Sequence, residues 1–246
     1  MLRPNLDPRV QDRGPDGVSG ETPQMPHIPD PVDTASANKA ALRKQLRARR
    51  AAVTAAERHA AGLQLARLAL RHRLLARRRR IGFYMPSKNE IDVLPLLRIA
   101  LRMGVTCYLP VVPGRALAST GRRKLWFTRL AGNEKGLDQP HPGWVNNRYG
   151  IPEYQPRTTR WVRSRQLDLL FMPLLGFDSQ GSRIGMGGGY YDASLAHLRQ
   201  RQHWRRPHLI GVAFSVQEID KAPSDPWDVR LDGILTERGY RLVHKA

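Results

Sequence analysis

The sequence predicts an α/β fold, built on an open, mainly parallel and twisted sheet with helices on both faces. The first observation is a series of short apolar runs with the length and composition of buried strands, such as DLLFMP at 168–173 and HLIGVAF at 208–214. The second is that such runs alternate along the chain with helix-forming segments, the order expected when helices cross between parallel strands. We therefore expect a three-layer, Rossmann-like domain over residues 39–246, preceded by a separate extension.

The extension covers residues 1–38 and contains seven prolines but almost no periodic apolar residues. Such a composition buries too little apolar surface to offset the entropy lost on ordering. We expect this segment to be disordered.

Two helices are predicted at the start of the domain. The first follows from KAALRKQLRARR, which begins at Lys39 and contains good helix formers. The second should begin near Ala55, because Thr54 and Glu57 have the spacing of a capping box, and should run to about His72.

Strands and helices then alternate to the end of the chain. Asp92 can cap a helix that stops at Gly104, and the Pro/Gly-rich stretch 132–160 should be irregular. The predicted strands are 81–85, 105–112, an antiparallel 125–130, 168–173, 208–214 and a last strand at 232–236, with a helix at 190–200.

Composition restricts the class of protein. The 246 residues contain no apolar stretch near the ~20 residues that a membrane span needs, and no secretory signal. A single cysteine, Cys107, excludes an internal disulfide and suits a cytoplasmic protein, with the cysteine as a buried apolar residue. From residue 39 onward 38 basic side chains face 15 acidic ones, so the domain should attract anions, whether nucleotide, small polyanion or RNA.

A glycine-rich loop is the strongest chemical signal. Gly181 and Gly185–Gly189 lie between an apolar strand and an amphipathic helix, where backbone N–H groups can converge on an anion. The helix start adds a positive dipole end, and Arg183 supplies a donor fork suited to phosphate oxygens. Asp192 is an oxygen ligand suited to Mg²⁺. The loop lacks the Gly-Lys-Ser/Thr of a Walker A motif and the spacing of a dinucleotide fingerprint, so it predicts phosphate binding and names no substrate.

The segment RIGMGGGYYD, residues 183–192, resembles the phosphate loop of 5-formyltetrahydrofolate cyclo-ligases, whose bacterial members often read RLGMGGGFYD. The resemblance implies that Arg183 is catalytic, that Asp192 ligates Mg²⁺, and that Tyr190 lies beside the folate. Some relatives carry basic residues where Met186 and Gly188 stand. The residues implied to contact ATP in this segment are Arg183, Ile184, Gly185, Met186, Gly187, Gly188, Gly189, Tyr190 and Tyr191.

Further motifs occur in family order. KAALR matches the family's K-x-x-x-R helix, so Lys39 and Arg43 are implied to hold ATP, with Lys39 also catalytic, whereas Arg47 and Arg50 are interpreted as a solvated basic face. In YMPSKNEID, Glu90 is implied to bind the pterin and Met85 to pack against it.

Two later segments complete the family order. Asp232, before the predicted last strand, occupies the place of a second metal carboxylate, and Asp228 is interpreted as a turn residue. YGIPEYQP at 149–156 resembles a family segment and receives no chemical role.

The resemblance spans about residues 39–240 and implies a reaction. An enzyme of this family converts 5-formyltetrahydrofolate and ATP to 5,10-methenyltetrahydrofolate, ADP and phosphate, with Mg²⁺ as cofactor. The formyl oxygen attacks the γ-phosphorus, the 10-nitrogen then attacks the formyl carbon, and phosphate leaves. We expect a monomer whose substrate can carry a polyglutamate tail.

Two alternatives remain open at this point. One is a non-catalytic RNA-binding protein on the same scaffold, favoured by the arginine runs at 77–80 and 199–206 but lacking a known RNA-binding motif. The other is a different ATP-dependent ligase or kinase.

Overall fold

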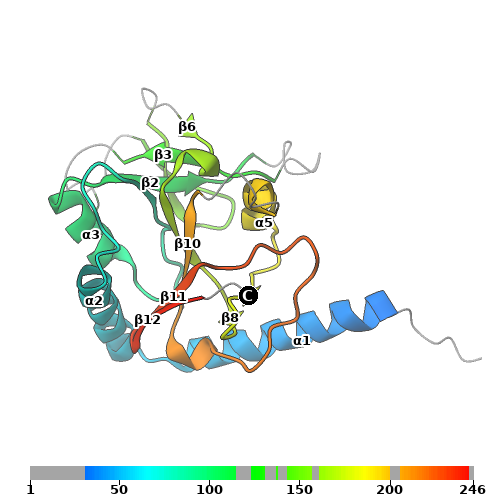
Figure 1. The fold of residues 1–246 in the computed structure, drawn as a ribbon. Helices are drawn as coiled ribbons and strands as arrows, with labels where there is room; N and C mark the ends of the chain where they lie inside the picture. The colour runs from blue at the N-terminus through cyan, green and yellow to red at the C-terminus, as the bar shows by residue number, and fades with distance from the viewer. Residues whose placement is uncertain are drawn as a thin grey trace, which may run out of the picture.

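The computed structural model describes residues 31–114, 123–130, 137, 143–156, 161–199 and 206–243, and of residues 31–37 it describes the backbone alone. Figure 1 shows a central sheet with α2 and α3 on one face, α5 on the other, and α1 across one end. The predicted α/β architecture with helices on both faces is confirmed. Within the described residues no helix is both long and apolar enough to cross a membrane.

Eight strands form the main sheet in the order β12-β11-β10-β7-β1-β2-β3-β6. The five strands β11, β10, β7, β1 and β2 pair in parallel, and β3, β6 and β12 join antiparallel. The strand bounds are β1 Arg80–Gly82, β2 Thr106–Val111, β3 Trp126–Arg129, β6 Trp161–Val162, β7 Leu169–Pro173, β10 His208–Val212, β11 Gly233–Thr236 and β12 Gly239–Leu242.

Two small hairpins lie outside this sheet. β4 Trp144–Asn146 pairs with β5 Pro152–Tyr154, and β8 Gly176–Phe177 pairs with β9 Arg183–Ile184. Each hairpin gives a regular backbone geometry to a segment that lies between strands of the main sheet.

The helices begin and end for local reasons. α2, Ala55–Arg71, starts with the predicted capping box, in which the side chains of Thr54 and Glu57 bond each other's backbone amides. α3, Leu94–Arg102, starts where the Asp92 carboxylate accepts the Leu94 N–H at 2.9 Å. The remaining helical segments are α1 Pro31–Ala52, α5 Tyr190–Leu195, and the 3₁₀ turns η2 Ser164–Gln166, η3 Ala196–Leu198 and η4 Ser215–Gln217.

Several predicted element boundaries were wrong. The first helix begins at Pro31, before the predicted start at Lys39. Residues 1–30 of the predicted extension lie outside the described residues. The stretch 132–160, predicted to be irregular, contains the β4–β5 hairpin. β12 follows the strand predicted to be the last one, and the helix predicted over 190–200 is α-helical only to Leu195. Strands of two or three residues are too short to show the alternation of apolar and polar residues from which a strand is predicted.

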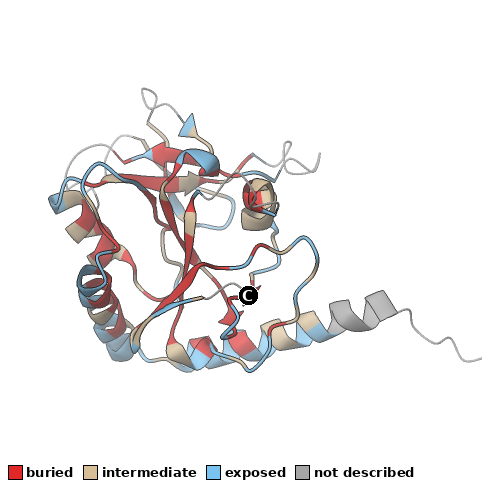
Figure 2. Cartoon of the chain, viewed as in Figure 1, coloured by how far each residue is buried: buried red, intermediate tan, exposed pale blue. Residues whose placement is uncertain are grey.

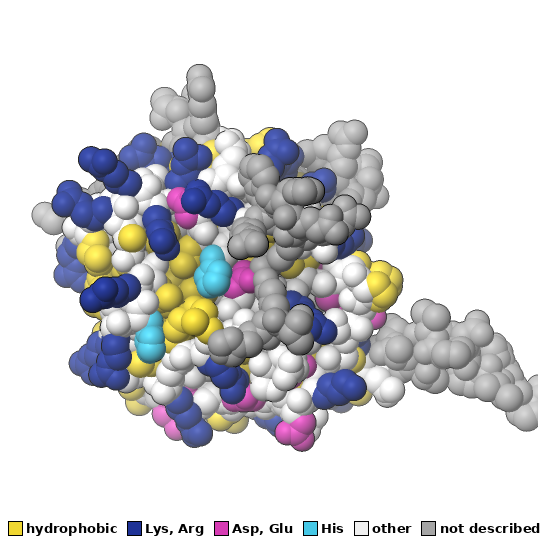
Figure 3. Space-filling view, viewed as in Figure 1, with side chains coloured by type: hydrophobic (Ala, Val, Ile, Leu, Met, Phe, Trp, Pro, Cys, Tyr) yellow, Lys and Arg dark blue, Asp and Glu magenta, His cyan; other side chains and the backbone are white. Residues whose placement is uncertain are grey.

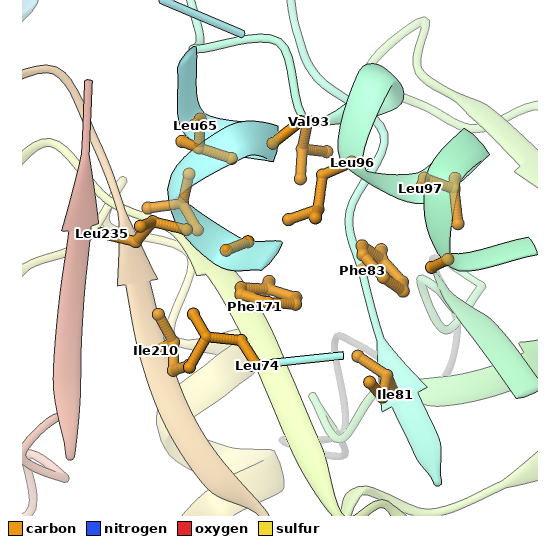
Figure 4. Close-up of a cluster of buried hydrophobic side chains, with 14 of the residues drawn as sticks. Leu65, Leu74, Ile81, Phe83, Val93, Leu96, Leu97, Phe171, Ile210 and Leu235 are labelled. Carbon is orange, nitrogen blue, oxygen red and sulfur yellow. The ribbon is translucent and has the colours of Figure 1, made fainter. Parts of the chain in front are cut away.

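The core lies on both faces of the sheet. Figure 4 shows Leu65, Val93 and Leu96 from the α2–α3 side packed toward Phe171, Ile210 and Leu235 of the strands. The opposite face packs Phe177, Leu195 and Leu231 over the same strands. Figure 2 shows buried residues along the strands and on the inner sides of the helices. Cys107 is buried as predicted, and burial raises the pKa of its thiol to about 12.

Candidate active site

The candidate site lies at the carboxyl ends of the parallel strands, where the strand order reverses. From β1 the chain proceeds to β2 on one side, whereas β7, β10 and β11 extend the sheet on the other side. Open α/β sheets bind ligands at such a switch point, outside the carboxyl ends of the two diverging strands. Here the segment that follows β1 carries Glu90, and the segment that follows β7 leads through the β8–β9 hairpin to the glycine loop.

The glycine loop, residues 185–189, is open on its outer side. Gly187 and Gly189 have φ of 100° and 66°, a conformation that side-chain-bearing residues rarely adopt. A Cβ built at Gly185 would meet nothing within 4 Å. Within the described residues, the N–H groups of residues 186–189 make no hydrogen bond. The loop therefore presents unpaired backbone donors, as an anion cradle requires.

Helix α1 lies against the other side of the loop. Arg43 Nε donates to the Gly185 carbonyl at 3.1 Å, and Arg47 Nη2 donates to the Met186 carbonyl at 3.2 Å. Because a trans peptide directs its C=O and N–H oppositely, the N–H groups of Met186 and Gly187 point away from α1. Arg43 lies beside the loop, and its implied role toward ATP stays a prediction. Arg47 is exposed, as interpreted from the sequence, and it also contacts the loop.

Lys39 faces a different segment of the chain. Its ammonium lies 2.5 Å from Asp225 Oδ2 and 3.5 Å from Asp228 Oδ2, in the connection between η4 and β11. Asp228 also accepts the Asp225 N–H at 2.8 Å, so it closes a turn as predicted. The implied role of Lys39 toward ATP stays a prediction.

Arg183 joins the two ends of the loop region. Its guanidinium is buried and donates to the Val229 carbonyl and to Asp192 Oδ1, so protein acceptors occupy both terminal nitrogens. Asp192 is in the first turn of α5 and its side chain is 28% exposed. The pair with Arg183 uses Oδ1 of Asp192. The second oxygen, Oδ2, can therefore serve as a ligand for a cation that accompanies a phosphate.

Glu90 is buried and is held by two donors. Its Oε2 accepts the Ser87 N–H at 2.9 Å, and its Oε1 accepts Arg50 Nη1 at 3.4 Å. Sequence reasoning missed Arg50, which was assigned to a solvated face but is only 6% exposed. A basic run on an amphipathic helix does not reveal which arginine faces inward.

Tyr84, which is buried, and Tyr191, which is partly buried, lie beside Glu90. Burial raises the pKa of the Tyr84 and Tyr191 phenols, and the Glu90 carboxylate raises both further. Tyr84 donates to the Ile91 carbonyl at 2.9 Å. Glu90 therefore lies among neutral phenols, with Arg50 as its cationic partner.

The β4–β5 hairpin brings an aromatic cluster to the start of α5. Tyr149 and Tyr190 join their hydroxyls at 3.0 Å, and the Arg148 guanidinium lies 5.1 Å and 5.6 Å from the two ring centroids. The buried Glu153 fixes the hairpin by accepting from Val112 N and Asn147 Nδ2. Arg148 and Tyr149 were not predicted as site residues, and the segment 149–156 was given no chemical role.

Two further predicted residues lie near other elements. Met85, implied to contact the folate, is partly buried against the α2–α3 core. Asp232 accepts the Leu209 N–H at 2.8 Å and lies 3.7 Å from His208 Nδ1, at the start of β10. The described residues contain no cluster of three potential metal ligands, so the joint role of Asp192 and Asp232 toward a metal stays a prediction.

Comparison with known proteins gives a consistent result. A sequence model of the 5-formyltetrahydrofolate cyclo-ligase family matches residues 35–237. The chain is 30% identical to a 5-formyltetrahydrofolate cyclo-ligase of Haemophilus influenzae, over 79% of this chain and 95% of the relative. It is 27% identical to the corresponding enzyme of Mus musculus, over 83% and 96%.

Solved structures show the same fold. The 5,10-methenyltetrahydrofolate synthetase of Aquifex aeolicus superposes with a TM-score of 0.64 at 24% identity, covering 85% of this chain and 94% of that one. The synthetase of Mycoplasma pneumoniae gives a TM-score of 0.56 at 25% identity, covering 81% and 99%.

Proposed function

Because the chain belongs to the 5-formyltetrahydrofolate cyclo-ligase family, we propose that this ligase of folate one-carbon metabolism converts 5-formyltetrahydrofolate to 5,10-methenyltetrahydrofolate. ATP is the co-substrate, and ADP and phosphate are released. The observation that carries the proposal is the open glycine loop, with its unpaired N–H groups, at a switch point that it shares with Glu90.

The reaction needs positioning more than a protein nucleophile. The formyl oxygen attacks the γ-phosphorus of ATP and ADP leaves; the 10-nitrogen then attacks the activated formyl carbon, and phosphate leaves with the former formyl oxygen. Catalysis of phosphoryl transfer consists largely of in-line placement and neutralisation of charge. Backbone N–H groups and fixed cations can place the phosphate in line and neutralise its charge.

The nucleotide would occupy the outer side of the glycine loop. The N–H groups of Met186 and Gly187 would bind phosphate oxygens, while Arg43 holds the loop from behind. Asp192 would hold the Mg²⁺ ion, which neutralises charge on the phosphates. The triphosphate would compete with Asp225 for the ammonium of Lys39, because that pair is partly exposed.

The folate would bind beside Glu90. A carboxylate matches the paired N–H donors of a pterin, and burial among neutral phenols strengthens such a hydrogen bond. Tyr190, at the start of α5 and held by Tyr149 and Arg148, would also contact the folate. A polyglutamate tail on the substrate is consistent with the positive charge of the domain.

The direct test is product formation. We expect the protein, mixed with 5-formyltetrahydrofolate, Mg²⁺ and ATP, to produce the near-ultraviolet absorption band of the methenyl product, and to produce none when ATP is omitted. Absence of product together with tight, salt-sensitive RNA binding would instead support the non-catalytic alternative.

A further inference from the structure

Arg50 is the buried exception on the basic face of α1. It is 6% exposed, whereas Arg47 and Arg49 on the same helix are exposed. Its Nη1 lies 3.4 Å from Glu90 Oε1 and 4.0 Å from the sulfur of Met186. One guanidinium group therefore touches both the carboxylate assigned to the pterin and the loop assigned to the phosphates.

The position of Arg50 is costly for stability. Burial lowers its pKa, and the opposing effect comes from the charge of Glu90 and from Tyr84. Its Nε atom is also buried, without a hydrogen-bond partner among the described residues. A buried cation with an unsatisfied donor is a poor way to stabilise a fold, and an apolar side chain of similar size is often tolerated better. The arrangement calls for a role other than stability.

We propose that Arg50 is a positioning residue that couples the two substrates, by holding Glu90 and Met186 in one arrangement. The inference rests on the proposed function. When the phosphate loop closes on ATP, Met186 moves relative to Arg50, and Arg50 adjusts the Glu90 carboxylate that receives the folate. Each substrate then binds more tightly when the other is present, as reciprocal coupling requires.

The coupling is measured with a non-hydrolysable ATP analogue, titrated calorimetrically with and without 5-formyltetrahydrofolate. In the wild-type protein we expect folate to tighten analogue binding. In Arg50→Met the ratio of the two dissociation constants should approach one. Arg50→Lys retains the charge without the planar fork, so it should restore part of the coupling. Arg49→Met, an exposed neighbour on α1, should behave as wild type.

Steady-state kinetics gives a second measure. Arg50→Met should raise the KM for 5-formyltetrahydrofolate by roughly 10- to 100-fold, the range for losing a hydrogen bond to a charged group. Glu90→Gln should have a similar effect, and the double variant should be little worse than either single one, because the two residues act as a unit. A role confined to stability would instead lower the unfolding temperature and leave the coupling ratio and KM unchanged.

Several outcomes would overturn the proposal. One is an unchanged coupling ratio in Arg50→Met, and another is strict multiplication of the Arg50 and Glu90 effects. If Arg50→Met does not fold, the proposal is overturned when Arg50→Lys and Glu90→Gln both keep the full coupling of the wild-type protein. Wild-type binding without coupling refutes this inference alone, whereas coupled binding without methenyl product refutes the proposed reaction.

Discussion

The charged side chains around the glycine loop are paired with protein groups before any ligand binds. Arg183 is bonded to Asp192, Glu90 to Arg50, and Lys39 to Asp225. The first two pairs fix groups that the proposed reaction uses and would reduce the reorganisation required when substrates arrive, whereas the Lys39–Asp225 pair must open before Lys39 can contact ATP. The loop amides of residues 186–189 are different, because no group among the described residues accepts a hydrogen bond from them.

Arg183 provides the first prediction at the residue scale. Arg183→Ala should lower kcat/KM by about 100-fold or more, because Arg183 holds Asp192, the proposed Mg²⁺ ligand, and the loss of a preorganised group in a charge-stabilising site has effects of that size. The variant should remain folded by circular dichroism, with Arg183→Lys recovering part of the activity. Full activity in Arg183→Ala would remove this residue from the site.

The phenols of Tyr84 and Tyr191 give a pH dependence. Burial raises the pKa of Tyr84 and Tyr191 above the ordinary value of 10.0, so both stay protonated in the folded chain where the unfolded chain begins to ionise. Their contribution to stability is complete below pH 10 and is lost as the pH rises above that value. We expect the free energy of unfolding, measured in urea between pH 8 and pH 11, to fall over the upper part of this range.

Tyr191→Phe tests the origin of this alkaline loss. The variant lacks one ionisable group, so its free energy of unfolding should fall less steeply above pH 10 than that of the wild-type protein. Tyr149→Phe, which changes an exposed ring, serves as the matched control. Equal slopes for Tyr191→Phe and wild type would contradict the assignment.

At the scale of elements, the docking of α1 determines the shape of the site. Leu46 is fully buried against Leu175, Ile184 and Ala222, so the helix lies directly on the β8–β9 hairpin. Its arginines can reach the loop carbonyls only from this position. The helix thus contributes through its place in the fold as well as through its charge.

Gly176 permits this close approach. A Cβ at Gly176 would lie 2.6 Å from Leu46 Cδ1, so Gly176→Ala should displace α1 and destabilise the chain by about 1–3 kcal/mol, the range for overpacking. Displacement of Arg43 and Arg47 should also raise the KM for ATP. Gly239→Ala, where the Cβ meets nothing within 4 Å, should change neither quantity. An unchanged KM in a destabilised Gly176→Ala would separate α1 docking from nucleotide binding.

At the scale of the whole molecule, topology brings the site together. β1 and β7 are sequence-distant neighbours in the sheet, so the segments that follow them meet at one edge. Figure 3 shows Lys and Arg side chains spread widely over the visible face, with few acidic ones between them. Such a distribution raises the local concentration of anionic substrates without selecting among them, and selection comes from the site itself.

The sequence by itself determined the fold class, most elements, the position of the glycine loop and, through resemblance, the family. Periodicity, capping residues and glycine clusters depend on residues that are close together in the sequence. The capping box at Thr54 and the open loop at Gly185 are examples of such local features. The short hairpins lacked such a signal and were missed.

Only the tertiary structure decided which charges meet. Arg47, Arg49 and Arg50 are equivalent in sequence, yet α1 docking leaves Arg49 exposed, directs Arg47 to a loop carbonyl and buries Arg50 against Glu90. Likewise, Lys39 pairs with Asp225 and Asp228, and Arg148 contacts Tyr190, although these residues are far apart in the sequence. The orientation of a helix on a sheet depends on packing over the whole interface, and no local pattern of residues specifies it.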